Sequence, residues 1–190
     1  MHHRTNIFGA PGAGTTTLGK ALAQRLGCAF FDSDDYYWFT DDPLPYRRKR
    51  NPEHRLRLLR ADLEQAGSCV VSGALLGWGD TILSGFDAVV YRWLPVETRL
   101  ERIRQRETAR YGAARIEPGG DLNSVFEKFM LWAADYDHAP ESRQRGFLAE
   151  EAWLKNGCQA PVLRLADDLP VPVLVEKINH WLESQGTRTK

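Results

Sequence analysis

Short apolar runs alternate along this chain with longer stretches in which apolar residues recur every three or four positions. Five short runs are typical of buried β-strands. They are Thr5–Phe8, Cys28–Phe31, Cys69–Ser72, Ala88–Leu94 and Val162–Leu165. Leu18, Leu22 and Leu26 follow the first run at helical spacing and predict an amphipathic helix. Strands that alternate regularly with helices indicate an α/β fold with a mostly parallel sheet and right-handed crossovers.

Capping residues mark the other predicted helices. Asn51 and Pro52 supply an N-cap and a proline at the first helical position, and this helix ends near Gly67. The remaining helices are expected to begin at Pro95, to begin at an Asp121 cap, to cover about Glu141–Asn156, and to carry Leu174, Ile178 and Leu182. Thr40–Arg50 and Gly112–Gly120 contain Pro, Gly and basic residues, so we expect mobile loops there.

Composition narrows the class of protein without indicating an activity. The 190 residues suffice for one domain with a substantial core, and 43% apolar with 26% charged residues is ordinary globular composition. The 25 basic and 25 acidic residues cancel, which disfavours nucleic-acid and membrane partners. The three cysteines match no metal-site spacing, so we expect reduced thiols and a cytoplasmic protein. We also expect either a monomer or a homodimer. We expect no transmembrane helix, because no apolar run reaches about 18 residues, and we expect no signal peptide before the glycine-rich segment.

The strongest chemical signal is the glycine-rich loop between the first predicted strand and helix, Gly9-Ala10-Pro11-Gly12-Ala13-Gly14-Thr15-Thr16-Thr17. Its spacing is that of the P-loop, G-x-x-x-x-G-K-[ST], whose backbone N–H groups bind phosphate together with the following helix N-terminus. We expect Thr16 to ligate Mg²⁺. The residues expected to hold a nucleotide are Gly9, Gly12, Ala13, Gly14, Thr15, Thr16 and Thr17. The alternative is a turn that binds nothing, and the strand–loop–helix context favours the P-loop.

One position departs from the motif, because Thr15 stands where the P-loop has a lysine. That lysine normally brings a positive charge to the β- and γ-phosphates, and a threonine brings none. Either another cation replaces the charge, or the protein binds nucleotide and turns it over slowly. Lys20 lies one turn along the helix and is more typical of a solvated surface residue.

Two carboxylates, Asp32 and Asp34, follow the second predicted strand at alternate positions. The carboxyl edge of an open α/β sheet faces the ligand crevice, so both are candidate site residues. We expect Asp32 to hold Mg²⁺ through water and Asp34 to accept a proton from an acceptor hydroxyl. The alternative is that these acids cap the next helix, a role that we assign to Asp35.

Arginines are concentrated in the predicted helix that begins at Pro95. Their spacing places four of them on one helical stripe. These four are Arg99, Arg102, Arg106 and Arg110. Guanidinium groups suit polyphosphate because each can bond two oxygens at once. The alternative is a solvated helix in which Glu101 and Glu107 pair with the arginines.

The next segment, Tyr111–Gly120, has glycines at both ends and carries Arg115. A hinged segment that brings arginines onto phosphates is a lid, and a lid excludes water from a transfer reaction. Arg102, Arg106 and Arg115 are therefore our candidates for the charge that Thr15 lacks. On the acceptor side we expect Arg55, and also Gly73, which ends the third strand among small residues that leave room for a ligand.

These features together resemble the small P-loop kinases, both shikimate-kinase-like and nucleoside-monophosphate-kinase-like. The resemblance rests on the P-loop, the Asp-x-Asp after the second strand, the small-residue turn after the third, and the Leu-Pro helix with its hinged lid. Gly12–Gly19 and Asp34-Asp35-Tyr36 are similar to a bacterial group of adenylate-kinase-like P-loop ATP-binding proteins. The resemblance spans nearly the whole chain.

The resemblance implies a three-layer P-loop NTPase fold with a five-stranded parallel sheet of order 2-3-1-4-5 and a helical lid. It implies one domain over residues 1–190, with an acceptor-covering segment at about 36–66 and the lid at about 106–124. It also implies use of ATP and Mg²⁺, with adenine near the turn Leu165–Asp168.

Two functions remain open at this point. The first is an ATP- and Mg²⁺-dependent phosphotransferase, adenylate-kinase-like in general type, that acts on a small molecule or nucleotide. The second is a nucleotide-binding regulatory protein with little or no turnover, and Thr15 is the reason to consider it.

Overall fold

The structure, a computed structural model, describes residues 3–41, 44 and 46–186. Its strands form one parallel sheet in the order β2-β3-β1-β4-β5, which confirms the predicted fold class. The strands are β1 (Arg4–Gly9), β2 (Ala29–Asp32), β3 (Cys69–Ser72), β4 (Ala88–Arg92) and β5 (Val162–Leu165). Residues 42, 43 and 45 of the expected acceptor-covering segment lie outside the described residues, as do the two ends of the expected 1–190 domain.

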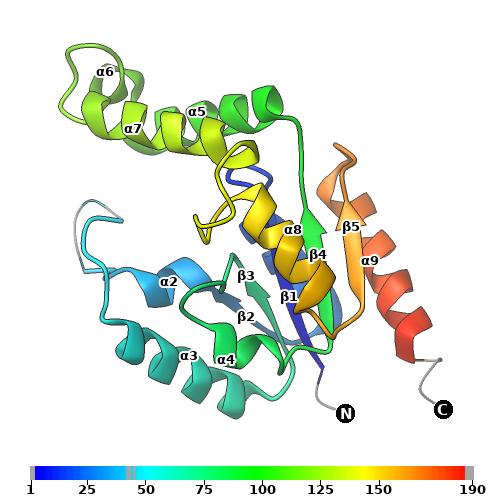
Figure 1. The fold of residues 1–190 in the computed structure, drawn as a ribbon. Helices are drawn as coiled ribbons and strands as arrows, with labels where there is room; N and C mark the ends of the chain where they lie inside the picture. The colour runs from blue at the N-terminus through cyan, green and yellow to red at the C-terminus, as the bar shows by residue number, and fades with distance from the viewer. Residues whose placement is uncertain (1–2, 42–43, 45, 187–190) are drawn as a thin grey trace.

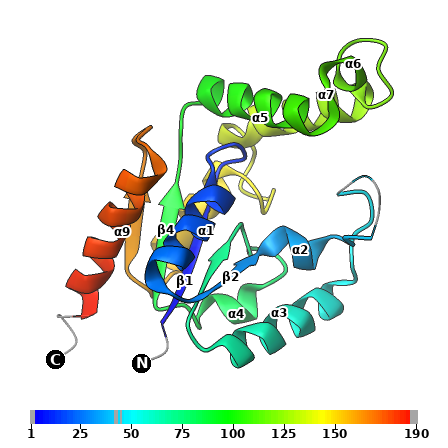
Figure 2. The same cartoon turned by 180° about the vertical axis from the view of Figure 1, so that it is seen from behind.

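Helices cover both faces of the sheet, so the fold has three layers. The helices are α1 (Thr15–Leu26), α2 (Ser33–Tyr37), α3 (Pro52–Ala66), α4 (Asp80–Leu83), α5 (Val96–Tyr111), α6 (Ala113–Ile116), α7 (Asn123–Ala134), the short 3₁₀ turn η1 (Asp135–Asp137), α8 (Phe147–Asn156) and α9 (Val171–Gly186). α1 and α9 lie together on one face, which faces the viewer in Figure 2. α3, α4 and α8 cover the other face. No helix in the described part of the chain has an apolar stretch long enough to span a bilayer.

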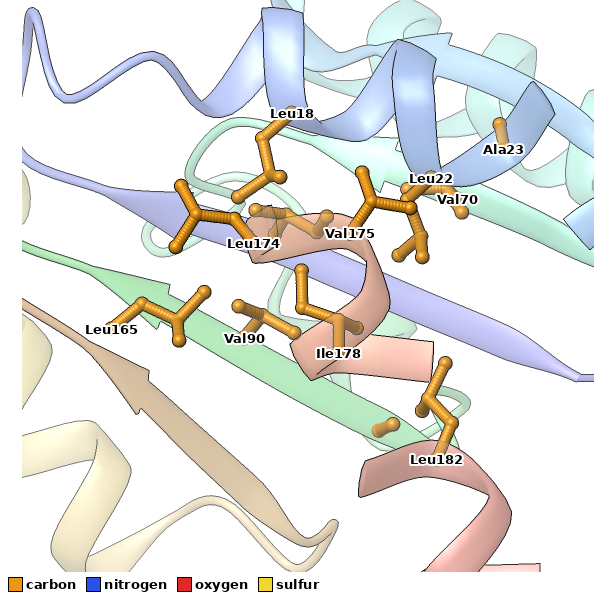
Figure 3. Close-up of a cluster of buried hydrophobic side chains, with 12 residues drawn as sticks. Leu18, Leu22, Ala23, Val70, Val90, Leu165, Leu174, Val175, Ile178 and Leu182 are labelled. Atoms are coloured by element: carbon orange, nitrogen blue, oxygen red, sulfur yellow. The ribbon is translucent and has the colours of Figure 1, made fainter. Parts of the chain in front are cut away.

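Alternating strand residues supply the two cores. Ile7 and Val90 point toward α1 and α9, whereas Phe8 and Val89 point toward α8. This alternation follows from the two-residue period of a strand. On α9, the predicted residues Leu174, Ile178 and Leu182 form the stripe that packs against β4 and α1, and Ile178 is fully buried (Figure 3). Helical spacing in the sequence therefore identified the buried side of α9 correctly.

The helices α5, α6 and α7 form an arm that projects beyond the carboxyl ends of the strands (Figure 1). The expected lid, at about residues 106–124, corresponds to the end of α5, the whole of α6 and the start of α7. Gly112 joins α5 to α6 at φ 85°, a backbone conformation that glycine adopts readily. The arm has its own small core, in which Ile103, Ile116 and Phe126 are buried.

Four predicted boundaries differ from the structure. β2 begins at Ala29, because the Cys28 N–H still bonds the Ala23 carbonyl at the end of α1. β4 ends at Arg92, the register partner of Gly9, where β1 turns into the loop. Residues 140–146 are not helical and α8 begins only at Phe147. Likewise α7 begins at Asn123 without an Asp121 cap, because that carboxylate pairs with Arg115.

Candidate active site

The glycine-rich loop joins β1 to α1 at the carboxyl edge of the sheet, and its glycines are required by close packing. Gly9, Gly12 and Gly14 all have positive φ, of 147°, 83° and 87°. A Cβ on Gly9 would lie 1.9 Å from the Arg92 carbonyl oxygen, and one on Gly12 would lie 2.5 Å from that of Arg99. No side chain fits at those distances. The loop is therefore pressed against β4 and α5, a constraint that motif spacing alone did not reveal.

Thr16 and Asp32 meet beside this loop, as the sequence predicted for a magnesium site. The Thr16 hydroxyl donates to Asp32 Oδ2 at 2.8 Å. The other oxygen, Oδ1, accepts from the Asp34 N–H at 3.1 Å and so caps α2. The expectation that Asp35 would be the cap is wrong, because Asp32 at the strand end is better placed for this bond. A hydroxyl and a carboxylate oxygen are hard donors that suit Mg²⁺, which usually takes one or two protein oxygens beside substrate phosphates.

Asp34 lies in the first turn of α2 and lines the same cavity as the loop. Burial raises the pKa of its carboxyl, because the charged form loses solvation there. The positive charge of Arg145 lowers the pKa, while Asp32 and Asp35 raise it further. A carboxyl with a raised pKa is a stronger proton acceptor than an ordinary aspartate.

A cavity of about 510 Å³ lies between the loop, α2, the end of β3 and the arm. This volume is in the range of small-molecule sites. Among the predicted residues, those that line it are Gly9, Gly12, Thr15, Thr16, Asp32, Asp34, Gly73 and Arg106. The end of α2, the arm and η1 add an aromatic wall, which includes Tyr37, Trp38, Tyr111, Phe126, Phe129, Trp132 and Tyr136. The cavity thus combines polar and charged groups with an aromatic wall.

Three other predicted loop residues take different places. Ala13 is buried against Tyr136, and its carbonyl faces away from the cavity toward Arg92. Gly14 is the N-cap of α1 in the left-handed conformation. Thr17 is exposed in the first turn of α1. Their backbone N–H groups still belong to the loop and the first turn of the helix, which are the parts of a P-loop that bind anions.

The structure brings two of the three candidate lid arginines to the loop. Arg106 lines the cavity, and its Nε donates to Glu107 at 2.7 Å. Arg102 Nη1 lies 3.8 Å from the position that a Cβ on Gly14 would occupy, and the same side chain pairs with Asp168. Asp168 belongs to the turn after β5 where adenine was expected, so that turn lies beside the loop.

Arg115 and Arg55 are not brought to the cavity. Arg115 bonds both oxygens of Asp121, at 2.9 and 2.6 Å, on the exposed side of the arm. Arg55 stacks on the Tyr37 ring at 3.6 Å and donates to the Arg50 carbonyl at 2.7 Å. Both side chains are held by local partners. Tyr37, on which Arg55 stacks, does line the cavity.

The predicted arginine stripe on α5 is wrong at one position. Arg99 is fully buried, whereas Arg102 is half-buried and Arg106 and Arg110 are exposed. The Arg99 guanidinium pairs with Asp137 and donates to the carbonyls of Pro11 and Ala133. Glu107 pairs with Arg106 and Arg110, as the alternative interpretation proposed. The stripe therefore divides into a buried arginine behind the loop and exposed arginines along the arm.

Sequence reasoning missed several polar residues of the site. Arg145 and Glu150 line the cavity, and both come from the segment that was expected to be one continuous helix. Glu150 is fully buried and accepts a hydrogen bond from the Tyr136 hydroxyl. Burial raises its pKa to about 7. Arg145 lies in a polar stretch of the sequence and Glu150 follows Leu148 and Ala149, and neither pattern is specific enough to assign a role.

Comparisons with known proteins agree with this geometry. A shikimate kinase family model matches residues 11–38, which contain most of the loop, Asp32 and Asp34. The chain is 39% identical over 185 residues to "Uncharacterized protein YqaC" of Bacillus subtilis (strain 168), across 97% of this chain and 99% of that protein. It is 29% identical over 139 residues to a cytidylate kinase of Archaeoglobus fulgidus, across 68% of this chain and 74% of that protein.

A solved structure has the same fold. It is the shikimate kinase of Acinetobacter baumannii in complex with shikimate, with a TM-score of 0.55 and 16% identity, across 96% of this chain and 94% of that one. Identity at this level establishes a shared architecture only.

Proposed function

The chain belongs to the small P-loop kinases, and on this premise we propose that it is an ATP- and Mg²⁺-dependent phosphotransferase acting on a small molecule or nucleotide. One observation carries the proposal. The glycine-rich loop, the Thr16–Asp32 pair and the Asp34 carboxylate all meet in a single cavity of about 510 Å³. Those are the parts that phosphoryl transfer to a hydroxyl or phosphate oxygen requires.

ATP binds with its phosphates on the loop and at the N-terminus of α1, where backbone N–H groups and the helix dipole favour an anion. Thr16 and Asp32 hold Mg²⁺, which neutralises charge on the β- and γ-phosphates when it is bound. The adenine would lie toward the turn that contains Asp168, the residue that pairs with Arg102. Arg106 contacts the transferring phosphoryl group from the arm. Arg102 adds a second positive charge at the phosphates when its side chain separates from Asp168.

The acceptor occupies the aromatic half of the cavity, between α2 and the arm. Tyr37 and Trp132 line this half with aromatic surface that suits a planar or sugar-like molecule. Arg145 lies near both Asp34 and Glu150, as its effect on both pKa values indicates, and it provides positive charge for an anionic substituent. Asp34 orients the acceptor oxygen and takes its proton as the transfer proceeds.

The test is a comparison of Asp34→Asn with Asp35→Asn. Asp35 is the next residue and is exposed, so it controls for loss of a charge in α2 without loss of the cavity carboxylate. We expect Asp34→Asn to keep Mg²⁺–ATP binding in calorimetry and to lose about 10²–10⁴-fold in acceptor-dependent ADP release. Asp35→Asn should keep both Mg²⁺–ATP binding and acceptor-dependent ADP release. Loss of ATP binding together with turnover in Asp34→Asn would show that this acid is structural and would remove it from the mechanism.

A nucleotide-binding regulatory role is the second candidate, and Thr15 is the observation that favours it. Thr15 lines the cavity and brings no charge to it. This role predicts micromolar ATP binding with no ADP release across a screen of sugars, sugar acids, nucleosides and nucleoside monophosphates. If any one acceptor stimulates ADP release, and Asp34→Asn abolishes this release, the result supports the kinase instead.

A further inference from the structure

Two buried arginines lie behind the glycine-rich loop, on the side away from the cavity. Arg92 ends β4 and is 2% exposed, and Arg99 lies in the first turn of α5 and is 0% exposed. Arg92 Nε donates to the Ala13 carbonyl at 2.7 Å. Arg99 Nη1 donates to the Pro11 carbonyl at 3.3 Å. Each guanidinium therefore holds one carbonyl oxygen of the loop.

The geometry of a trans peptide gives these bonds a consequence on the opposite side of the loop. The carbonyl of Ala13 and the N–H of Gly14 belong to one planar peptide and point in opposite directions, as do the carbonyl of Pro11 and the N–H of Gly12. Described residues supply no acceptor for the Gly12 and Gly14 N–H groups. A cation on the carbonyl polarises the peptide and makes the N–H a stronger donor. Both arginines thus strengthen donors that are free to bind an anion.

Arg92 differs from Arg99 in having no carboxylate partner. Arg99 pairs with Asp137, but within the described ranges no carboxylate oxygen lies within 4.0 Å of the Arg92 nitrogens. The acids nearest in the fold, Asp167 and Asp168, are already paired with Lys177 and Arg102. The second bond of Arg92 goes to the Asp167 backbone carbonyl at 3.3 Å.

An unpaired buried charge is costly, so its retention calls for a counter-ion. Burial and the neighbouring Arg102 lower the pKa of Arg92, whereas the charges of Asp168 and Asp167 raise it, and a guanidinium keeps its proton in any protein environment. A polyphosphate on the loop is the anion that this position lacks.

We propose that Arg92, supported by Arg99, supplies from behind the loop the positive charge that the P-loop lysine supplies from the cavity side. Arg92 is then a positioning residue for the nucleotide phosphates, and it acts through the Ala13–Gly14 peptide. This inference rests on the proposed use of ATP. It explains how the loop can carry Thr15 in place of lysine. The positive charge near the phosphates is kept, but it comes from Arg92 behind the loop.

The experiment measures binding of Mg²⁺–ATP and of adenosine by calorimetry to the wild type, Arg92→Gln and Arg92→Lys. We expect Arg92→Gln to weaken ATP binding by about 10- to 100-fold, the effect of a lost charged hydrogen bond, and to leave adenosine binding unchanged. Arg92→Lys keeps the charge and should recover part of the ATP affinity. Arg164→Gln is the matched control, because Arg164 lies on the adjacent strand β5, is exposed and pairs with Glu151. It should bind both ligands as the wild type does.

Restoring the lysine gives a second, independent readout. Thr15→Lys should return the ATP affinity of Arg92→Gln toward the wild-type value. In the wild-type background the same change should alter ATP affinity by no more than about fivefold, because the charge is already present. A gain well beyond fivefold in the wild type would overturn the inference, and this single variant decides the matter even if Arg92→Gln does not fold.

The outcomes separate this inference from the proposed function. A wild type that does not bind ATP up to millimolar concentration contradicts the proposed function itself. A wild type that binds ATP, with Arg92→Gln binding it equally well, overturns only the role of Arg92. Equal losses of ATP and adenosine affinity in Arg92→Gln, together with a lower melting temperature, would show a purely structural arginine and overturn it as well.

Discussion

Glu150 makes the stability of the fold depend on pH, and the dependence can be worked out from the structure. The side chain is fully buried, and it accepts a hydrogen bond from Tyr136, whose own hydroxyl lies 3.0 Å from that of Tyr91. Its Oε1 has no hydrogen-bond partner in the described part of the chain. Burial raises the pKa of the carboxyl from 4.5 to about 7, although Tyr136 and Arg145 both favour the charged form.

The direction of the effect follows from proton binding. Between pH 4.5 and about pH 7 the folded protein keeps a proton on Glu150 that the unfolded chain has released. The free energy of unfolding therefore falls as pH rises through this window, because the folded state binds more protons. A pKa that rises from 4.5 to about 7 corresponds to a loss of about 3 kcal/mol. The contribution is fully present below pH 4.5 and is lost by about pH 8.

The assay is urea unfolding followed by tryptophan fluorescence at pH 5 and pH 8. Glu150→Gln keeps the shape of the side chain and cannot ionise, so the wild type should lose about 3 kcal/mol more than this variant between the two pH values. Glu127→Gln is the control, because Glu127 is exposed on α7, and its pH dependence should match the wild type. Parallel pH profiles for the wild type and Glu150→Gln would refute the reasoning, since the buried carboxyl would then titrate as an ordinary glutamate.

Three further predictions concern the acid, the turn after β3 and the core. Because burial raises the pKa of Asp34 above 3.8, activity should fall on acidification at a higher pH than an ordinary aspartate gives, and an acid limb of kcat/KM at or below pH 4 would contradict its role as base. Gly73→Ala puts a Cβ 2.0 Å from Ser33 Oγ and should destabilise the fold by about 1–3 kcal/mol in urea unfolding. Gly119→Ala has the same φ of 92° with open space around it, so a loss as large there would mean that the Ser33 contact is irrelevant. Ile178→Ala should cost about 2–5 kcal/mol, and a loss below about 1 kcal/mol would mean that the α9 core is loosely packed.

The spacing of apolar residues was sufficient to predict the strands and most helices and their order along the chain. The apolar runs found all five strands. The central strands β3 and β4 are buried along their whole length, and such strands are largely apolar in sequence. The loop motif and the acids after the second strand gave Thr16 and Asp32 as neighbours of one magnesium ion, and their side chains are hydrogen-bonded, since the carboxyl ends of parallel strands share one edge of the sheet. Resemblance to a family added the strand order, which periodicity cannot give.

The sequence pattern did not predict the positions of several charged side chains, because those positions depend on tertiary contacts. Helical spacing put Arg99 on a stripe with Arg102 and Arg106, yet Arg99 is buried behind the loop. A helix was expected from Glu141, but residues 140–146 form the irregular segment that brings Arg145 to the cavity. Arg115 was expected over the phosphates, and Asp121 holds it elsewhere.

The sequence by itself determined the α/β fold, the phosphate-binding loop and the acids at the carboxyl edge, because each depends on residues close together along the chain. Only the tertiary structure decided where the charges act. Arg92 is 79 residues from Ala13 and Arg99 is 88 residues from Pro11, and only folding of β4 and α5 against the loop brings each pair together. The burial that perturbs Glu150 and Asp34 likewise exists only after the layers have packed, because desolvation is a property of the whole fold.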